Sequence, residues 1–233
     1  MKRVLNLYAG VGGNRKLWDD CDVVAIENDQ QIAEAYQQLY PQDTMIVTDA
    51  HQYLKEHLLD GWDFIWSSPP CQSHSKLQRF IVGNHKKLTY PDLEQLYGEI
   101  ILLQSLAPPE TAWCVENVIP YYQPLIPPTS ILGRHYAWAN RALPHISATN
   151  AIRISRERRQ NNSTQLSRMR VSNDKEIEEE YSLHLPACAD NWGYYKRRQV
   201  MRNCVDPLIG KALFDTIFGA TIERQYTLLD VMS

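Results

Sequence analysis

Residues 62–72 read Trp62-Asp63-Phe64-Ile65-Trp66-Ser67-Ser68-Pro69-Pro70-Cys71-Gln72. The short aromatic and β-branched run at the start predicts a buried strand that ends at the two prolines. Proline fixes φ and restricts the residue before it, so the backbone that presents Cys71 is expected to be stiff. Open α/β sheets bind ligands at the carboxyl ends of their strands. Cys71 is therefore a candidate nucleophile, and a buried structural cysteine is the alternative.

The chain around this stretch alternates short apolar runs with helical patterns, as α/β proteins do. Strands are expected at Val4–Leu7, Val23–Ile26, Thr44–Val47, Phe64–Ser67 and Trp113–Glu116. Apolar residues at helical spacing predict helices at Gln30–Tyr40, Tyr90–Ser105 and Pro207–Phe218. The first two helices are expected to pack on the sheet, and the last to rejoin the main core.

Composition favours one catalytic-sized domain with a small appendage, because 233 residues are enough for a single large core. The five cysteines, Cys21, Cys71, Cys114, Cys188 and Cys204, are scattered without CxxC or Cys/His ligand spacing. No structural metal is therefore expected. The N-terminus does not resemble a signal peptide, and no run approaches the ~20 apolar residues of a membrane span. A cytoplasmic protein without membrane contact is the expectation.

The alternating pattern breaks after the proline-rich residues 120–128, and residues 145–197 are polar and irregular. We expect a catalytic core at 1–144, a small appendage at 145–197, and a return to the core at 198–233. The formal net charge is −3, but six arginines lie in residues 151–170 against one acid. Such a segment suits contacts with phosphates and base edges, and a charged surface hairpin without a partner is the alternative.

The first predicted strand is followed by Tyr8-Ala9-Gly10-Val11-Gly12-Gly13, a glycine-rich turn that a ligand could approach closely. The turn is neither GxGxxG nor GxxxxGK(S/T), so the common dinucleotide and triphosphate loops do not fit. Glu27 and Asp49 end the next two strands. An acid there can accept hydrogen bonds from ribose hydroxyls, although Asp49 could instead cap the next helix. Together the three strand ends predict one nucleoside-like ligand.

In this order, the motifs resemble those of the cytosine-C5 DNA methyltransferases. Residues 5–13 resemble the family's cofactor loop, Pro70-Cys71-Gln72 its nucleophile motif, and Glu116-Asn117-Val118 its Glu-Asn-Val motif. Residues 202–208 resemble the closing Gly-Asn-x-Val motif. The resemblance covers about residues 1–145 and 198–219. It implies a Rossmann-like methyltransferase sheet with helices on both faces, plus a small target-recognition appendage.

The resemblance also implies S-adenosylmethionine as the cofactor and S-adenosylhomocysteine as its product. The residues expected to bind the cofactor are Tyr8, Ala9, Gly10, Gly12, Gly13, Glu27, Asn28, Asp49, Ala50, Pro70, Asn203 and Val205.

Cytosine C5 is too weak a nucleophile to take a methyl group directly, so a nucleophile must first add to C6. By resemblance, Cys71 would form this bond, and Glu116 would protonate N3 as a general acid. Arg134 would orient the pyrimidine and Glu116, with Arg141 as the weaker candidate. A base inside a duplex cannot reach such a pocket, so the target cytosine would be flipped out.

The expected partner is double-stranded DNA, bound by a monomer. Residues 72–89 would form a basic lid over the flipped base, and an ordinary solvated loop is the alternative. The residues expected to contact nucleic acid are Gln72, Ser73, Ser75, Lys76, Arg79, Arg153, Arg156, Arg158, Arg159, Arg168 and Arg170.

The chain departs from the family in several places. His74 stands where the family has Phe, Arg202 stands where glycine is usual, and the Gln-x-Arg-x-Arg motif is missing. The short recognition segment suggests a compact, phage-like member of a restriction-modification type, acting in a bacterial or phage-infected cell. Three alternatives stay open: the same chemistry on RNA or a free cytosine nucleotide, a catalytically silent DNA-binding relative, and a Rossmann oxidoreductase. The oxidoreductase explains neither Pro-Cys-Gln nor Glu-Asn-Val.

Overall fold

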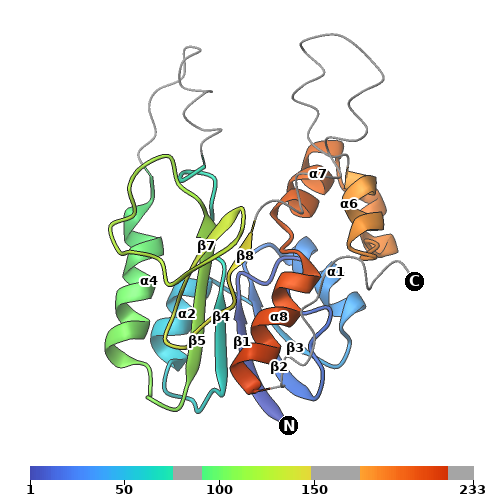
Figure 1. The fold of residues 1–233 in the computed structure, drawn as a ribbon. Helices are drawn as coiled ribbons and strands as arrows, with labels where there is room; N and C mark the ends of the chain where they lie inside the picture. The colour runs from blue at the N-terminus through green and yellow to red at the C-terminus, as the bar shows by residue number, and fades with distance from the viewer. Residues whose placement is uncertain (76–90, 148–173, 220–233) are drawn as a thin grey trace, which may run out of the picture.

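The structure is a computed structural model that describes residues 1–75, 91–147 and 174–219. Within these residues an eight-stranded sheet forms the centre of the molecule, in the order β3-β2-β1-β4-β5-β7-β6-β8 (Figure 1). The strands are β1 (Lys2–Leu7), β2 (Cys21–Glu27), β3 (Thr44–Val47), β4 (Phe64–Ser67), β5 (Ala112–Val118), β6 (Ser130–Gly133), β7 (His135–Ala139) and β8 (Ile146–Ser147).

The five strands predicted from the sequence are confirmed, and they form five adjacent parallel strands of the sheet. Along this part the strand order reverses between β1 and β4, because β2 and β3 lie on one side of β1 and β4 and β5 on the other. Ligands of open α/β sheets bind where the order reverses, outside the carboxyl ends of the strands. The glycine turn after β1 and the Pro-Cys turn after β4 both lie at this point.

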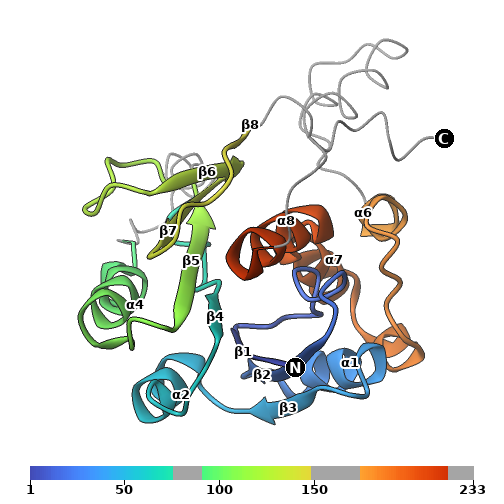
Figure 2. The same cartoon turned by 60° about the horizontal axis from the view of Figure 1, so that its bottom comes forward.

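Helices cover both faces of the sheet (Figure 2). Apolar side chains alternate along the strands: Val4, Phe64 and Trp66 face one core with α1 and α8, and Leu5 and Ile65 face the other with α2 and α4. The helices are α1 (Gln30–Leu39), α2 (Ala50–His57), α4 (Leu93–Leu106), α6 (Asp174–Glu180), α7 (Tyr194–Asn203) and α8 (Pro207–Phe218), with a 3-10 turn η3 (Ala187–Asn191). In the described ranges, no helix has the length and apolar character needed to cross a bilayer.

A third apolar cluster joins the C-terminal half of the chain to α1. Val11 and Ala35 pack there with Trp192 and Met201, which come from residues around α7. Lys196 on α7 also forms an ion pair of 2.8 Å with Asp29, the N-cap of α1. The described residues 174–219 therefore pack on the N-terminal core. The arginine-rich residues 151–170, predicted to contact nucleic acid, lie outside the described residues.

Helix α8 holds the glycine turn in place. The Trp18 ring stacks on Phe214 with 5.4 Å between centroids, and its Nε1 donates to the Gly210 carbonyl at 3.0 Å. A Cβ atom at Gly210 would lie 2.2 Å from the backbone oxygen of Asn14, just after the turn. The helix thus approaches the turn so closely that only glycine fits. This contact fixes the C-terminal helix against the first strand's loop.

The close approach of α8 gives a first test. Gly210→Ala should lower the free energy of unfolding by about 1–3 kcal/mol, because backbone must move to accept the methyl group. Gly98→Ala is the matched control: it is also helical, but a Cβ there would meet nothing within 4 Å. That change should raise stability by about 0.5–1 kcal/mol. Urea unfolding of both variants measures the effects, and equal shifts would contradict the packing described.

Candidate active site

The glycine turn after β1 is shaped to receive a ligand. Tyr8 and Gly10 both have positive φ, 55° each, which turns the chain sharply after the strand. The Gly10 N–H donates to Glu27 Oε2 at 3.1 Å, so the turn is tied to the end of β2. A Cβ atom at Gly10 would meet nothing within 4 Å. The space above the turn is therefore open beside a carboxylate.

Two acids stand at adjacent strand ends, as predicted. Glu27 Oε1 accepts the Asn28 and Asp29 N–H groups at 2.9 and 3.0 Å. A carboxylate has about four acceptor positions, so one stays available for a ribose hydroxyl. Asp49 is exposed and accepts the Gln52 N–H at 2.8 Å, which makes it the N-cap of α2. The helix-cap role that the sequence left open for Asp49 is thus present in the fold.

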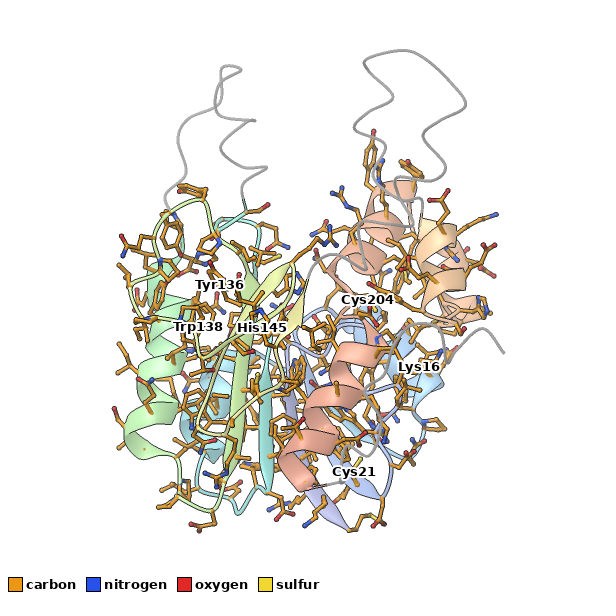
Figure 3. The ribbon with its side chains drawn as sticks, in the orientation of Figure 1. Lys16, Cys21, Tyr136, Trp138, His145 and Cys204 are labelled. Atoms are coloured by element: carbon orange, nitrogen blue, oxygen red, sulfur yellow. The ribbon has the colours of Figure 1, made fainter. Side chains whose placement is uncertain are left out.

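The two glycines that follow in the turn serve close packing. A Cβ atom at Gly12 would lie 2.4 Å from the Tyr40 ring, and one at Gly13 would lie 2.3 Å from Cys204 Sγ. The Val205 carbonyl is equally close to the Gly13 position. Figure 3 labels Cys204, which stands between α7 and α8. The closing motif therefore returns to the turn, as the resemblance implies, with Val205 buried and Asn203 exposed.

A buried polar cluster lies beneath these loops, around the carboxylate of Glu99 on α4. Glu99 is fully buried and accepts hydrogen bonds from the Tyr8 hydroxyl and, at 2.5 Å, from Ser67 Oγ. His51 Nδ1 lies 3.2 Å from the same carboxylate, and this hydrogen bond raises the pKa of His51. Burial and the charge of Glu99 raise the pKa of Tyr8 well above its usual value. The cluster joins the ends of β1, β4 and α2.

The Pro-Cys turn is fastened to the neighbouring strand β5. Asn117 Nδ2 donates to the Pro69 carbonyl at 2.9 Å, and Asn117 Oδ1 accepts the Val118 N–H at 3.0 Å. Cys71, half-buried, follows two residues later. Burial and the nearby charge of Glu116 raise the pKa of the Cys71 thiol to about 11. The thiol is therefore protonated at neutral pH in the free protein.

Glu116 lies at the end of β5 with two partners. Its Oε2 accepts a hydrogen bond from Ser68 Oγ at 2.9 Å, and its Oε1 lies 2.7 Å from Nδ1 of His135. Burial acts to raise the pKa of Glu116, but the charge of His135 and these two hydrogen bonds outweigh it and lower the pKa. Because Ser68 belongs to the Pro-Cys turn, Cys71 and Glu116 are held in one site.

The two arginine candidates lie apart from this pair. Arg134 is exposed in the turn between β6 and β7, one residue before His135. Arg141 donates to the Pro109 carbonyl at 2.8 Å. Pro109 precedes the amino end of β5, whereas Glu116 lies near its carboxyl end. The cationic partner of Glu116 is therefore His135, which no sequence motif indicated. Strand β7, which carries it, was not predicted either.

The residues directly after Cys71 are described as far as Ser75. Gln72 is exposed, and Ser73 Oγ accepts the Asp92 N–H at 3.0 Å. His74 is buried, with its Nδ1 2.6 Å from the Tyr122 hydroxyl. Its ring packs against that of Tyr122, with 5.9 Å between centroids. Ser75 pairs with Pro120 in an isolated bridge. Lys76 and Arg79, predicted to contact nucleic acid, lie outside the described residues, as does the predicted lid beyond Ser75.

Comparison with solved structures identifies the class of this fold. A DNMT2 mutant from Spodoptera frugiperda matches with a TM-score of 0.54 at 13% identity, over 94% of this chain and 100% of its own. The methyltransferase EhMeth from Entamoeba histolytica matches with a TM-score of 0.54 at 12% identity, over 94% and 98%. The fold is that of the S-adenosylmethionine-dependent methyltransferases, as predicted.

The N-terminal part of the sequence is similar to one family. Residues 2–101 match the family model of the C-5 cytosine-specific DNA methylases. The matched residues include the glycine turn and Cys71 and end before Glu116. The open turn beside Glu27 fits the nucleoside part of S-adenosylmethionine, the cofactor of proteins with this fold. No curated protein matches the chain. Among the described residues, no three His, Cys, Asp or Glu side chains are grouped as metal ligands would be.

The bonds of Asn117 give a second prediction. Asn117→Ala should lower stability by about 1–3 kcal/mol and also reduce methyl transfer, because Pro69 and the turn that carries Cys71 lose their anchor on β5. Asn140→Ala is the control. The Asn140 side chain also makes two hydrogen bonds to backbone: Oδ1 accepts from Trp113 N at 3.0 Å, and Nδ2 donates to Thr111 O at 2.8 Å. These bonds lie at the amino end of β5, away from the Pro-Cys turn. Unfolding and single-turnover rates should show similar destabilisation and a rate loss in Asn117→Ala alone.

Proposed function

We propose that the protein transfers a methyl group from S-adenosylmethionine to C5 of cytosine in DNA, through a covalent bond between Cys71 and C6. The observation that carries the proposal is the assembly of Cys71 and Glu116 by the Ser68–Glu116 hydrogen bond of 2.9 Å. The two groups come from different strands, yet the reaction needs both on one ring. The similarity of residues 2–101 to the C-5 cytosine-specific DNA methylases supports a cytosine in DNA as the methyl acceptor.

In this proposal the glycine turn and Glu27 hold the cofactor. Gly10 gives it access to the backbone, and Glu27 accepts from its ribose. Asp49, Ala50, Pro70, Asn203 and Val205 are the further residues we assign to it, together with Tyr8, Ala9, Gly12, Gly13 and Asn28. Bound S-adenosylmethionine supplies the methyl group that C5 takes up after Cys71 has added to C6.

The protein's own part is to make C5 nucleophilic. Cys71 adds as the thiolate, which must form after substrate binds, since burial and the charge of Glu116 hold the thiol pKa at about 11. Glu116, in its acid form, donates a proton to N3 of the cytosine, which draws electrons from C6 as Cys71 attacks. General acid catalysis of this kind is typically worth about 10²–10⁴ in rate.

Duplex DNA is the substrate we infer, with the target cytosine flipped into the site and the enzyme acting as a monomer. Gln72, Ser73 and Ser75 would stand next to the flipped base. We assign backbone contacts to Lys76, Arg79 and the six arginines of residues 153–170. Arg134, exposed beside His135, would contact the pyrimidine or its phosphate. The phage-like, restriction-modification role also belongs to this proposal.

Nucleoside mass spectrometry tests the reaction. Unmodified duplex DNA, the matching single strand and RNA of the same sequence are each incubated with S-adenosylmethionine carrying a labelled methyl group. Labelled 5-methylcytosine should appear in duplex DNA with the intact protein, and Cys71→Ala should yield none. Label in RNA alone would replace DNA by RNA as the substrate.

Product formed by Cys71→Ala would refute the covalent route. Cys114→Ala is the matched control, because Cys114 is a fully buried cysteine on β5, outside the Pro-Cys turn. This variant should keep methyl transfer even if it is less stable.

A further inference from the structure

Glu116 is paired with a titratable cation instead of a permanent one. The Nδ1 atom of His135 lies 2.7 Å from Glu116 Oε1, and the two side chains are 26% and 6% exposed. Arginine keeps its charge at every pH that a protein tolerates, whereas histidine gains and loses its proton near neutrality. The protonation state of this pair can therefore change under the conditions in which the enzyme works.

Groups on three elements determine that protonation state. Burial acts to lower the pKa of His135, but the charge of Glu116 and the hydrogen bond to it outweigh burial and raise the pKa, while Arg134 acts to lower it. Cys114 on β5 and Cys71 after β4 are the thiols that feel the charge of Glu116. Of these groups, only Glu116 stabilises the imidazolium. One proton is thus shared between His135 and Glu116 up to a pH above the ordinary value for histidine.

We propose that His135 positions Glu116 and stores the proton that Glu116 gives to N3 of cytosine. The inference rests on the proposed function above. A carboxylate whose pKa is lowered holds little proton of its own, so it needs a donor behind it. Nδ1 of His135 lies within hydrogen-bond distance of Glu116 Oε1, so His135 can pass its proton directly to Glu116. His135 is a positioning residue, because it acts through Glu116.

The thiol of Cys71 loses its proton to water, and the sulfur lone pair forms the bond to C6. The C5–C6 π pair becomes the C4–C5 double bond, and the electrons of the C4–N3 double bond take up the proton that passes from His135 through Glu116. After C5 has taken the methyl group, N3 returns its proton by the same route and water removes the C5 proton. The C6–S bond then breaks, and Cys71 leaves as a thiolate that regains a proton from water. The pair ends in the state in which it began.

The imidazolium also helps the nucleophile. A Cys71 thiolate beside an ionised Glu116 places two negative charges in one partly buried site, which is costly. His135 in its charged form offsets one of them. Both effects disappear together when the pair loses its proton, so the charged form of His135 is required for addition to C6.

Two variants of His135 separate charge from shape. His135→Arg supplies a permanent cation, and His135→Asn supplies a polar side chain without charge. Single-turnover rates are measured at saturating duplex DNA and S-adenosylmethionine from pH 6 to 10. At neutral pH, His135→Asn should lose about 10²–10⁴ in rate. His135→Arg should recover only the part of that loss that comes from the positive charge, because a guanidinium keeps its proton.

The informative quantity is the ratio of the His135→Arg rate to the wild-type rate. Ionisation of Cys71 affects both proteins alike and cancels. The ratio should be constant below the pKa of the wild-type pair and rise about tenfold per pH unit above it, since only wild type loses its cation. His57→Asn is the control, because His57 pairs with Asp60 at 2.8 Å on the surface of α2. Its ratio to wild type should stay flat.

A ratio that does not change with pH while wild type is active would overturn the role of His135 and leave the proposed function intact. Absence of 5-methylcytosine from wild type would instead overturn the proposed function, and the inference with it. A direct titration covers the case in which the arginine variant does not fold. The His135 ring should titrate by NMR above the ordinary value of about 6.5, and this pKa should fall in Glu116→Gln. An unshifted His135 would refute the pairing.

Discussion

The site depends on two side-chain bonds that join the ends of β4 and β5. Asn117 holds the Pro69 carbonyl at 2.9 Å, and Ser68 donates to Glu116 at 2.9 Å. The strands themselves are paired in parallel, with Ser67 opposite Val115. These contacts cross from one loop to the next strand, so they fix the nucleophile relative to the acid. Without these two bonds, Cys71 and Glu116 would still follow adjacent strands, but the loop that carries Cys71 would not be fixed relative to Glu116.

The second constraint is the return of the C-terminal segment to the first loop. Gly13 and Gly210 both lie where a methyl group would overlap backbone or a thiol, at 2.3 Å from Cys204 Sγ and 2.2 Å from the Asn14 oxygen. Trp18 seals the same contact by stacking on Phe214. The cofactor turn is thus built from both ends of the chain. This explains why the closing motif, remote in sequence, belongs to the same site.

Much of this was predictable from periodicity and turn chemistry. The five parallel strands and the helices α1, α4 and α8 follow from local patterns, and the order of motifs placed Cys71 and Glu116 at one edge of the sheet. The partner of Glu116 was not predictable in the same way. His135 reaches it through the antiparallel pairing of β7 with β5, where Glu116 lies opposite Ala137. That register depends on long-range contacts that no local pattern encodes. The burial of Glu99 was not predicted either, because a charged residue on a helix usually faces solvent.

Trapping the adduct tests most directly whether Cys71 becomes covalently attached to cytosine. Duplex DNA with 5-fluorocytosine at the target position should react, with S-adenosylmethionine present, to a methylated adduct that cannot eliminate fluorine. Mass spectrometry of the digested complex should find the nucleotide on the peptide that contains Cys71, and Cys71→Ser should give no such product. Methylation of ordinary DNA without a trapped adduct, or an adduct on another residue, would contradict the account.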